Sequence, residues 1–304
     1  MRIITKFYVN LSYRFEIMKK LTVAILLLLL GSTAVFAQRN ELGFGGGTSF
    51  YLGDINPKGV FYEPQWSAGL HYRYNFTTRW AMRFNLNYGR IHGDDANHNN
   101  PRNLDFRNDI YEFSGVAELN FLTFFTGSKK MYRCSPYLFA GLGVFFHNPQ
   151  GSYTPVAGGD KEWVYLRPLS TEGQGLVEYP ERKYSSAAQL CLPFGIGFKY
   201  SLSKHWSIEL EWGMRLTFTD YLDDVSTTYV NSDLLTANRG DLAALMSNKT
   251  GGTVIPGSER GNSSTKDWYS FAMLKLSYKI IPSKLANCPA YSQSKKTYRK
   301  PVWE

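Results

Sequence analysis

Residues 65–91 alternate between apolar and polar side chains in a way that limits the fold of the whole chain. From 65 to 76 the even positions are mostly apolar or aromatic and the odd ones small or polar, and the same parity resumes from Trp80 to Tyr88 after Thr77–Arg79. Successive side chains of a strand point to opposite faces, so the pattern predicts a hairpin with one apolar face. Aromatic residues stand near the ends of each apolar row, as they do in strands that cross a bilayer. The pattern therefore predicts a transmembrane β-barrel whose apolar row faces lipid.

The same parity test predicts eight strands along the chain. The least clear strand is Pro136–His147, because Phe139 and Phe145 occupy positions that should face a polar interior. The eight predicted strands are Glu41–Leu52, Gln65–Phe76, Trp80–Tyr88, Asn108–Leu122, Pro136–His147, Tyr184–Tyr200, Trp206–Phe218 and Trp268–Ile280.

The connections between these strands alternate strictly between two length classes. The shorter ones are Thr77–Arg79, Thr123–Arg133 and Ser201–His205, and the longer ones are Gly53–Pro64, His92–Arg107, Asn148–Lys183 and Asp220–Asp267. Short periplasmic turns and long extracellular loops alternate in this way in outer-membrane barrels. The sequence thus predicts an all-β fold, an eight-stranded antiparallel transmembrane outer-membrane β-barrel with both termini on the periplasmic side.

An eight-stranded barrel is filled by its own side chains, so we do not expect an open pore. Charged residues at inward positions should form ion pairs there, because buried charges need partners. The acids expected inside are Glu112, Glu118, Glu209 and Glu211, and the bases are Arg73, Arg83, Arg215, Lys199 and Lys275.

The N-terminal region has the layout of a secretory signal peptide. Lys19 and Lys20 precede the apolar run 21–30, and small residues lead to a cleavage site after Ala37. The alternative is an N-terminal anchor helix, but the run is short for a membrane span. We assign residues 1–37 to the signal peptide, with 1–17 as an upstream extension of the reading frame, 38–281 to the barrel and 282–304 to a basic periplasmic tail. The residue directly after the cleavage site is Gln38 and not cysteine, which excludes a lipoprotein.

Composition adds little evidence for other classes of function. The net charge of +9 could suggest nucleic acid, but no stacking or basic-helix module accompanies it, so we expect no nucleic-acid partner. Cys134, Cys191 and Cys288 have no metal-binding spacing. Cys191 should fill the barrel interior, and a disulfide between Cys134 and Cys288 at the periplasmic edge is left open.

Two constellations in the predicted outer loops could carry chemistry. Residues 220–224 hold three carboxylates, and together with His92 or His98 from other loops they could activate water or bind calcium. The spacing is not that of a calcium loop, and acidic loop residues are usually solvated or pair locally. A second stretch, 163–184, is either an ordered outer loop or a contact surface; its polar residues are Arg167, Glu172, Gln174, Glu178, Glu181 and Arg182. We therefore predict no catalytic, cofactor-binding or metal-binding residues and no cofactor.

Several segments together resemble the PorG-like family of outer-membrane barrels. They are Glu41–Gly47 followed by Tyr51–Asp54, Arg167–Gly175, Pro193–Gly197, Asp220–Val225 and Cys288–Pro289. The resemblance implies a part in the type IX protein secretion system of gliding and related Gram-negative bacteria. It further implies that the barrel anchors a periplasmic ring, formed by a PorK-type lipoprotein and a PorN-type protein, to the outer membrane. The family supplies no catalytic residues.

Three functions follow as hypotheses. The first is a non-enzymatic outer-membrane barrel that anchors this ring and contacts outer-membrane lipid. The alternatives are a lipid- or peptide-processing outer-membrane enzyme and a general membrane-stabilising or adhesion barrel. For the first, the expected contact surface is Lys129, Lys130 and Arg133 together with the basic tail from Ser283 to Glu304. An equally weighted alternative is that these charges are solvated or lie on anionic headgroups.

Overall fold

A computed structural model of the chain describes residues 40–57, 59–124, 133–155 and 159–280. The predicted signal peptide and cleavage site, the basic tail, Cys288, Lys129 and Lys130 lie outside the described residues, so the expectations about them remain predictions. Residues Glu41–Lys279 form one compact unit, and the description below concerns this unit.

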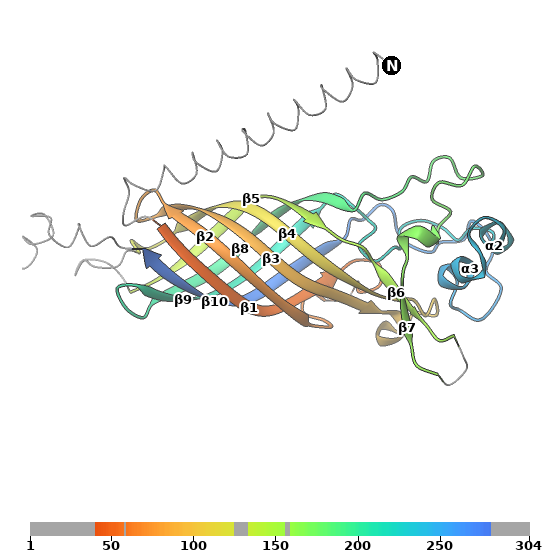
Figure 1. The fold of residues 1–304 in the computed structure, drawn as a ribbon, viewed down its shortest axis with the longest axis horizontal. Helices are drawn as coiled ribbons and strands as arrows, with labels where there is room; N and C mark the ends of the chain where they lie inside the picture. Colours follow the sequence, from red (N-terminus) through yellow and green to blue (C-terminus); the bar gives the residue numbers. More distant parts are fainter. Residues whose placement is uncertain (1–39, 58, 125–132, 156–158, 281–304) are drawn as a thin grey trace, which may run out of the picture. The chain divides into compact units, whose positions relative to one another are not determined.

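Eight long strands of the described chain close into an antiparallel barrel, which confirms the predicted fold (Figure 1). Each neighbouring pair is hydrogen-bonded, and pairing of the third strand with the fourth completes the ring in the order β3-β2-β1-β10-β9-β8-β5-β4. The strands are β1 (Asn40–Leu52), β2 (Gln65–Asn75), β3 (Trp80–Asp94), β4 (Asp105–Asn120), β5 (Cys134–Phe146), β8 (Ala188–Ser201), β9 (Trp206–Thr217) and β10 (Trp268–Ile280).

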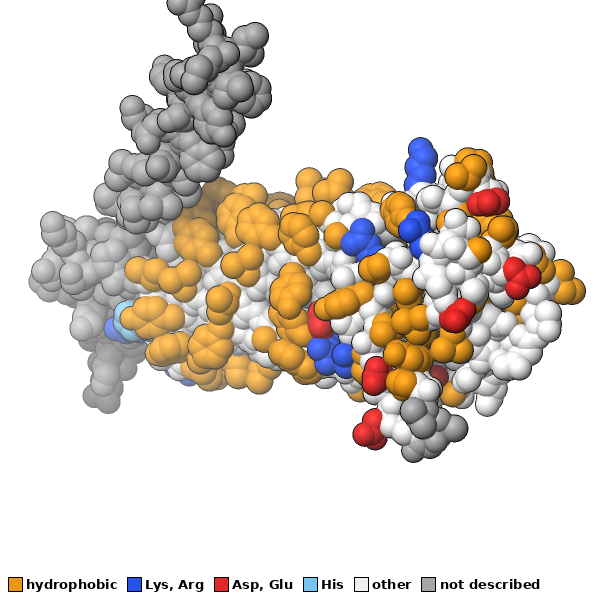
Figure 2. Space-filling view, turned by 45° about the vertical axis from the view of Figure 1, so that its right-hand side comes forward, with side chains coloured by type: hydrophobic (Ala, Val, Ile, Leu, Met, Phe, Trp, Pro, Cys, Tyr) orange, Lys and Arg blue, Asp and Glu red, His pale blue; other side chains and the backbone are white. Residues whose placement is uncertain are grey.

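Side chains point inward and outward with the predicted parity. Along β3 the residues alternate between exposed and buried over its first eight positions. Leu70 and Leu86 are 60% and 57% exposed, whereas Arg73 and Arg83 are 0% and 1% exposed. Apolar side chains therefore cover the outer surface of the barrel, and they form the broad band of hydrophobic residues seen in Figure 2.

The aromatic residues that made β5 hard to interpret do face the interior. Phe139 and Phe145 are 4% and 0% exposed, as strand parity requires. Phe139 fits because Gly195 and Gly213 on the two following strands leave space for its ring; a Cβ at Gly195 would stand 2.8 Å from the ring. The interior is thus partly aromatic, and glycines rather than polar residues accommodate the large side chains.

The long connections contain structure that strand parity does not predict. They hold the short strands β6 (Gln150–Tyr153) and β7 (Glu162–Tyr165), the helices α2 (Ser232–Arg239) and α3 (Asp241–Ser247), and the 3₁₀ turns η2 (Asp95–His98) and η3 (Arg167–Leu169). In Figure 1 these elements lie at one end of the barrel, which we call the loop end, and the start of β1 and the end of β10 lie at the other, the turn end. The strand predicted from Tyr184 begins only at Ala188. In the part of the chain that the structure describes, no helix is long and apolar enough to cross a membrane.

Candidate functional site

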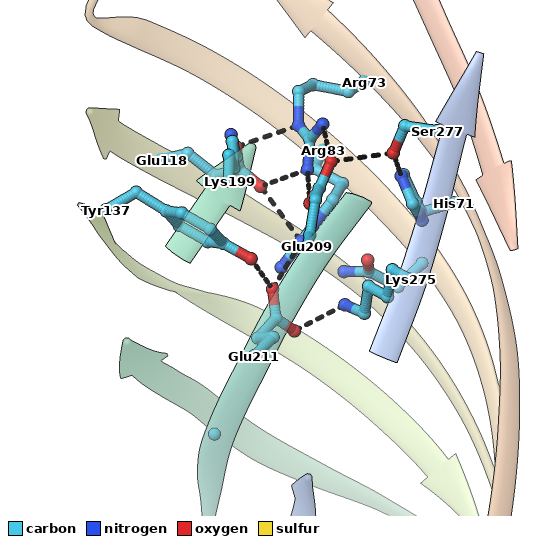
Figure 3. A network of polar contacts seen from close by, with 12 residues as sticks. His71, Arg73, Arg83, Glu118, Tyr137, Lys199, Glu209, Glu211, Lys275 and Ser277 are labelled. Carbon is cyan, nitrogen blue, oxygen red and sulfur yellow. Dashed lines mark hydrogen bonds and ion pairs between the residues drawn. The ribbon is translucent and has the colours of Figure 1, made fainter. Parts of the chain in front are cut away.

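The interior of the barrel toward the turn end holds a buried ion-pair network, which we call the lumen network (Figure 3). It brings together four acids and four bases, so that their formal charges cancel. The members are Glu41, Glu118, Glu209, Glu211, Arg73, Arg83, Lys199 and Lys275, and all are at most 5% exposed. The predicted pairing of inward charges is confirmed, and Glu41 is a member that the strand pattern did not single out.

Strand register creates the need for this network. Arg73 and Arg83 stand directly opposite each other on β2 and β3, an arrangement in which like charges repel. Carboxylates from other strands neutralise both. Arg73 contacts Glu41 at 2.7 Å, Glu118 at 2.9 Å and Glu209 at 2.6 Å.

The other bases complete the network. Arg83 bridges Glu118 at 3.0 Å and Glu211 at 2.5 Å. Lys199 contacts Glu118, and Lys275 contacts Glu211. Every member therefore touches at least one opposite charge, which is the condition under which buried charges are tolerated.

One serine–histidine contact lies beside the network. Its hydrogen-bond directions show whether the histidine could activate the serine as a nucleophile, as the enzymatic alternative would require. The ring Nε2 of His71 is 2.9 Å from Ser277 Oγ, and the Ser277 hydroxyl donates to Glu209 at 2.7 Å (Figure 3). A hydroxyl has a single hydrogen, so the His71 ring donates to the serine oxygen and does not act as its base. The arrangement is that of a structural hydrogen bond, not of an activated nucleophile.

Toward the loop end the interior becomes apolar. Glu112 pairs with Arg215 at 2.8 Å and accepts a hydrogen bond from Tyr269 at 3.0 Å. Beyond this pair lies a buried cluster that combines strand residues with loop residues. Its members are Tyr51, Ile55, Ile91, Leu104, Phe106, Ile110, Phe145, Cys191, Leu222, Val225, Tyr269, Phe271 and Met273. Cys191 faces inward in this cluster, as predicted.

The segment 220–225 closes the loop end of the barrel. Leu222 and Val225 are 0% and 1% exposed within the apolar cluster, and the carbonyl of Leu222 accepts a hydrogen bond from the side chain of Asn108 on β4 at 2.7 Å. We call this segment the plug. The lumen network toward the turn end and the plug toward the loop end therefore both place buried side chains in the described interior.

Above the plug, the long loops form an ordered cap centred on Glu172. Glu172 is 0% exposed. Its carboxylate accepts hydrogen bonds from the backbone N–H groups of Ser226 at 2.9 Å and Thr227 at 3.1 Å, and it pairs with Arg260 at 2.8 Å. Arg182 donates to the carbonyl of Glu172 at 2.8 Å. Thus the stretch 163–184 is an ordered loop, and some of its polar residues form hydrogen bonds and an ion pair inside the cap.

The acidic motif 220–224 is buried rather than solvated. Tyr51 donates a hydrogen bond to Asp223 at 2.5 Å, and its hydroxyl lies 3.0 Å from Asp267. Burial raises the pKa of Asp223 and that of Asp267 well above the usual range. One phenolic hydrogen cannot be donated to both carboxylates at once, and the raised pKa of each acid means that burial favours its neutral form.

The histidines do not join these carboxylates. His92 bonds through Nδ1 to the carbonyl of Phe106 at 2.6 Å and packs against Trp163. His98 is buried against Tyr62 and, within the described residues, its ring nitrogens have no hydrogen-bond partner. Among the described residues no three His, Cys, Asp or Glu side chains are grouped so as to hold a metal ion. The structure thus does not assemble the hydrolytic or calcium site considered for these residues.

Several key residues of the interior escaped prediction. Arg260 and Asp267 lie in a long loop, where no periodicity indicates which way a side chain points, whereas Tyr51 has inward parity in β1 but its partners lie in that loop. Cys134 is a free thiol in the described structure, and its suggested partner lies outside the described residues. Strand parity was a usable signal for Glu41 and Tyr51, because both have inward parity in β1.

We expect the loop end of the barrel to be more stable at acidic than at alkaline pH, and Asp224 of the plug should contribute most clearly. Burial raises the pKa of Asp224 to about 7, against an opposing effect of Arg260. A raised pKa means that the folded state favours the neutral carboxyl group. Its contribution is therefore fully present below the usual aspartate pKa near 4 and is lost as the pH rises through about 7.

The replacement Asp224→Asn tests this, because asparagine imitates the neutral acid and tolerates the left-handed backbone (φ 66°) at this position. Relative to the wild type, the variant should gain on the order of 2–4 kcal/mol between pH 5 and pH 8. Urea unfolding of both proteins at each pH measures the difference. Asp160→Asn, at an exposed loop position, should show a difference that does not change with pH. A pH-independent difference for Asp224→Asn would contradict the assignment.

Comparison with known families gives one match, which covers part of the chain. A family model described as a domain of unknown function (DUF6089) matches residues 19–158. No curated protein matches the chain.

Similar solved structures include three membrane proteins. Ail, the attachment invasion locus protein of Yersinia pestis, in complex with the heparin analogue sucrose octasulfate, is 12% identical, with 80% of this chain and 99% of that chain covered and a TM-score of 0.37. Neisserial surface protein A is 10% identical, with 79% and 96% covered and a TM-score of 0.37. A major outer membrane protein from Thermus thermophilus is 9% identical, with 79% and 98% covered and a TM-score of 0.38. The barrel assignment rests on the strand pairing of the chain itself.

Proposed function

We propose that this chain is an integral outer-membrane barrel with a structural rather than a catalytic or conducting role. The observation that carries the proposal is the filled interior, in which the lumen network and the plug together occupy the space that a channel would need. The apolar band on the outside supports a position in the membrane, because alternate residues of every strand face outward. The short turns then lie in the periplasm and the cap outside the cell.

The more specific role is that of an anchor for a periplasmic ring. This part of the proposal is supported by the resemblance to the PorG-like family, whose members are linked to the type IX secretion system. The partners would be a PorK-type lipoprotein and a PorN-type protein, and the lipid of the outer membrane would surround the barrel. A filled barrel suits this role, since an anchor needs rigidity and a membrane seal rather than a channel.

The surface proposed for ring contact is the basic tail 283–304 together with Lys129, Lys130 and Arg133. Charges on such a surface mainly increase association rate and specificity, and the tail aromatics Tyr291, Tyr298 and Trp303 would supply the stronger contacts. Deletion of 283–304 should leave the amount of barrel in the outer membrane unchanged and should abolish co-purification of the ring subunits from gently solubilised membranes.

The controls of this experiment separate the hypotheses. Lys249→Gln in the cap should leave ring co-purification unchanged, since a periplasmic partner cannot reach it. If the truncated barrel reaches the membrane and still co-purifies fully with the ring and supports secretion, the tail is not the docking segment. If neither variant nor wild type captures ring subunits, the anchoring role is wrong.

A second candidate, an adhesion barrel, is favoured by one observation on the cap. Val177 and Ile255 are 91% and 77% exposed there, and Tyr165 and Tyr184 are each 52% exposed. Large exposed apolar side chains above the membrane would suit contact with another macromolecule. The ring co-purification experiment distinguishes this function, because adhesion would not depend on the tail.

A further inference from the structure

The lipid-facing surface of β1–β4 carries an apolar groove of about 550 Å³ in the half of the barrel nearer the loop end. Small residues create it: Ala68 faces outward on β2 between the larger Trp66 and Leu70, directly opposite Tyr88 of β3. The groove is lined by Phe44, Gly45, Ala68, Gly69, Leu70, Leu86, Asn87, Tyr88, Tyr111, Glu112, Phe113 and Phe146. Its lining is mainly apolar, which suits an acyl chain.

A cluster of three aromatic rings lies at the loop-end limit of this groove. Trp66 and Tyr88 have their ring centroids 4.6 Å apart, and Tyr88 and Tyr111 are 5.1 Å apart. Tyrosine and tryptophan at the ends of outward rows take positions at the level of lipid headgroups. The cluster therefore marks where the hydrocarbon layer ends on this side of the barrel.

Two arginines follow immediately beyond the rings on the same strands. Arg90 comes two residues after Tyr88, a rise of about 7 Å along the strand, and stands opposite Asp109. Arg107 stands opposite His92, two residues further along the paired strands toward the loop end. Lys and Arg side chains also gather where the apolar band meets the cap in Figure 2. Positive charge thus lies next to the end of an apolar groove.

The two arginines differ in how far their charge is already balanced. Arg90 binds Asp109 through Nε at 2.8 Å and Nη2 at 3.1 Å, and Tyr88 donates to the same carboxylate at 2.7 Å. Arg107 has no carboxylate partner among the described residues. Its guanidinium lies 4.4 Å from the centroid of the Trp163 ring, and its Nε donates to a side-chain amide, that of Gln150 at 2.7 Å.

The remaining donors of Arg107 are available to an anion. Within the described residues its Nη groups have no hydrogen-bond acceptor, while stacking on Trp163 fixes the plane of the guanidinium. A held, planar guanidinium with free donors favours two-pronged binding of a phosphate. The geometry points to a bound phosphorylated lipid of the outer leaflet, with an acyl chain in the groove and a phosphate on Arg107. This inference rests on the proposed membrane position but not on ring anchoring.

The test uses the full chain, refolded in neutral detergent and titrated separately with lipid A, with dephosphorylated lipid A and with inorganic phosphate. Native mass spectrometry counts the bound molecules, and tryptophan fluorescence follows binding near Trp66 and Trp163. We expect one tightly bound lipid A, with dephosphorylated lipid A and inorganic phosphate each binding at least about tenfold more weakly.

Two variants test the phosphate contact and the apolar groove separately. Arg107→Gln should weaken lipid A binding by about tenfold or more by removing the charged donors. Ala68→Phe should fill the groove and weaken lipid A binding similarly, while leaving binding of inorganic phosphate unchanged. Both positions face outward, so the barrel interior is unaltered. Lys183→Gln, an exposed cap charge away from the groove, should bind as the wild type does.

Three results would overturn the inference. One is wild-type affinity for lipid A in both variants. Another is equal affinity for inorganic phosphate and lipid A, which would mean a headgroup site without the groove. The third is a second copy of the chain covering the groove, seen as a dimer that Ala68→Phe dissociates. None of these results bears on ring anchoring, which the tail deletion tests.

Discussion

Replacement of Arg73 by methionine should destabilise the barrel by about 3–5 kcal/mol, because three buried glutamates lose the cation that they share. Glu41, Glu118 and Glu209 all lie within 2.9 Å of this guanidinium, and none is more than 5% exposed. Methionine has nearly the length of the arginine stem, so the cost should come mainly from unpaired charge rather than from a void. Urea unfolding in detergent or lipid vesicles, followed by tryptophan fluorescence, measures it.

Two further proteins make this prediction specific to the network. The double variant Arg73→Met with Glu209→Gln should recover at least about 1 kcal/mol of the loss, since one of the unpaired carboxylates is then neutral. Arg79→Met, at an exposed position in a short turn, should change the free energy of unfolding by less than about 0.5 kcal/mol. Equal losses for Arg73→Met and Arg79→Met would show that the lumen network does not stabilise the barrel.

Replacement of Arg260 by methionine should open the cap while the barrel stays folded. Arg260 is 2% exposed, pairs with Glu172 at 2.8 Å and donates to the carbonyls of Asp224 at 2.6 Å and Ser247 at 3.1 Å. Its loss leaves Glu172 buried without a cation, at a cost of about 3 kcal/mol or more. Local opening of the cap should increase by about a hundredfold.

Limited proteolysis of the protein in vesicles gives the readout. Cleavage within 163–184 and 220–267 should accelerate strongly, and the strands should remain protected. Adding Glu172→Gln to the variant should slow cleavage again, because the uncompensated charge is removed. Arg239→Met, an exposed cap arginine, should digest at the wild-type rate. Cleavage of the strands at the same rate as the cap would show that cap and barrel unfold together.

The two predictions address different parts of one physical arrangement. Near the turn end, charge fills the lumen and is balanced by charge from other strands. Near the loop end, aromatic and aliphatic side chains fill it and the plug closes it. A barrel filled in this way is held together by its interior as well as by its strand pairing. Such a body suits an anchor or a surface scaffold better than a channel. We therefore propose that this protein acts through contacts made at the two ends of the barrel.

Strand parity predicted most of the barrel because the signal is local. The alternation of Trp66, Ala68 and Leu70 with Ser67 and Gly69 follows from backbone geometry within one strand, whatever lies around it. The inward charges were also predictable, since parity alone puts Arg73 and Glu209 inside. Even Phe139 obeyed parity, although its apolar character suggested otherwise, because glycines on other strands provide the space.

The sequence by itself therefore determined which residues face lipid, which face the lumen and how the strands alternate between short and long connections. Only the tertiary structure decided that Arg260 pairs with Glu172, that Tyr51 meets Asp223 and Asp267, and that the acidic segment 220–224 turns inward as part of a plug. These contacts join residues 88, 172 and 216 positions apart. In the loops no backbone periodicity sets the direction of a side chain, so its partner is chosen by packing and by the need to neutralise buried charge.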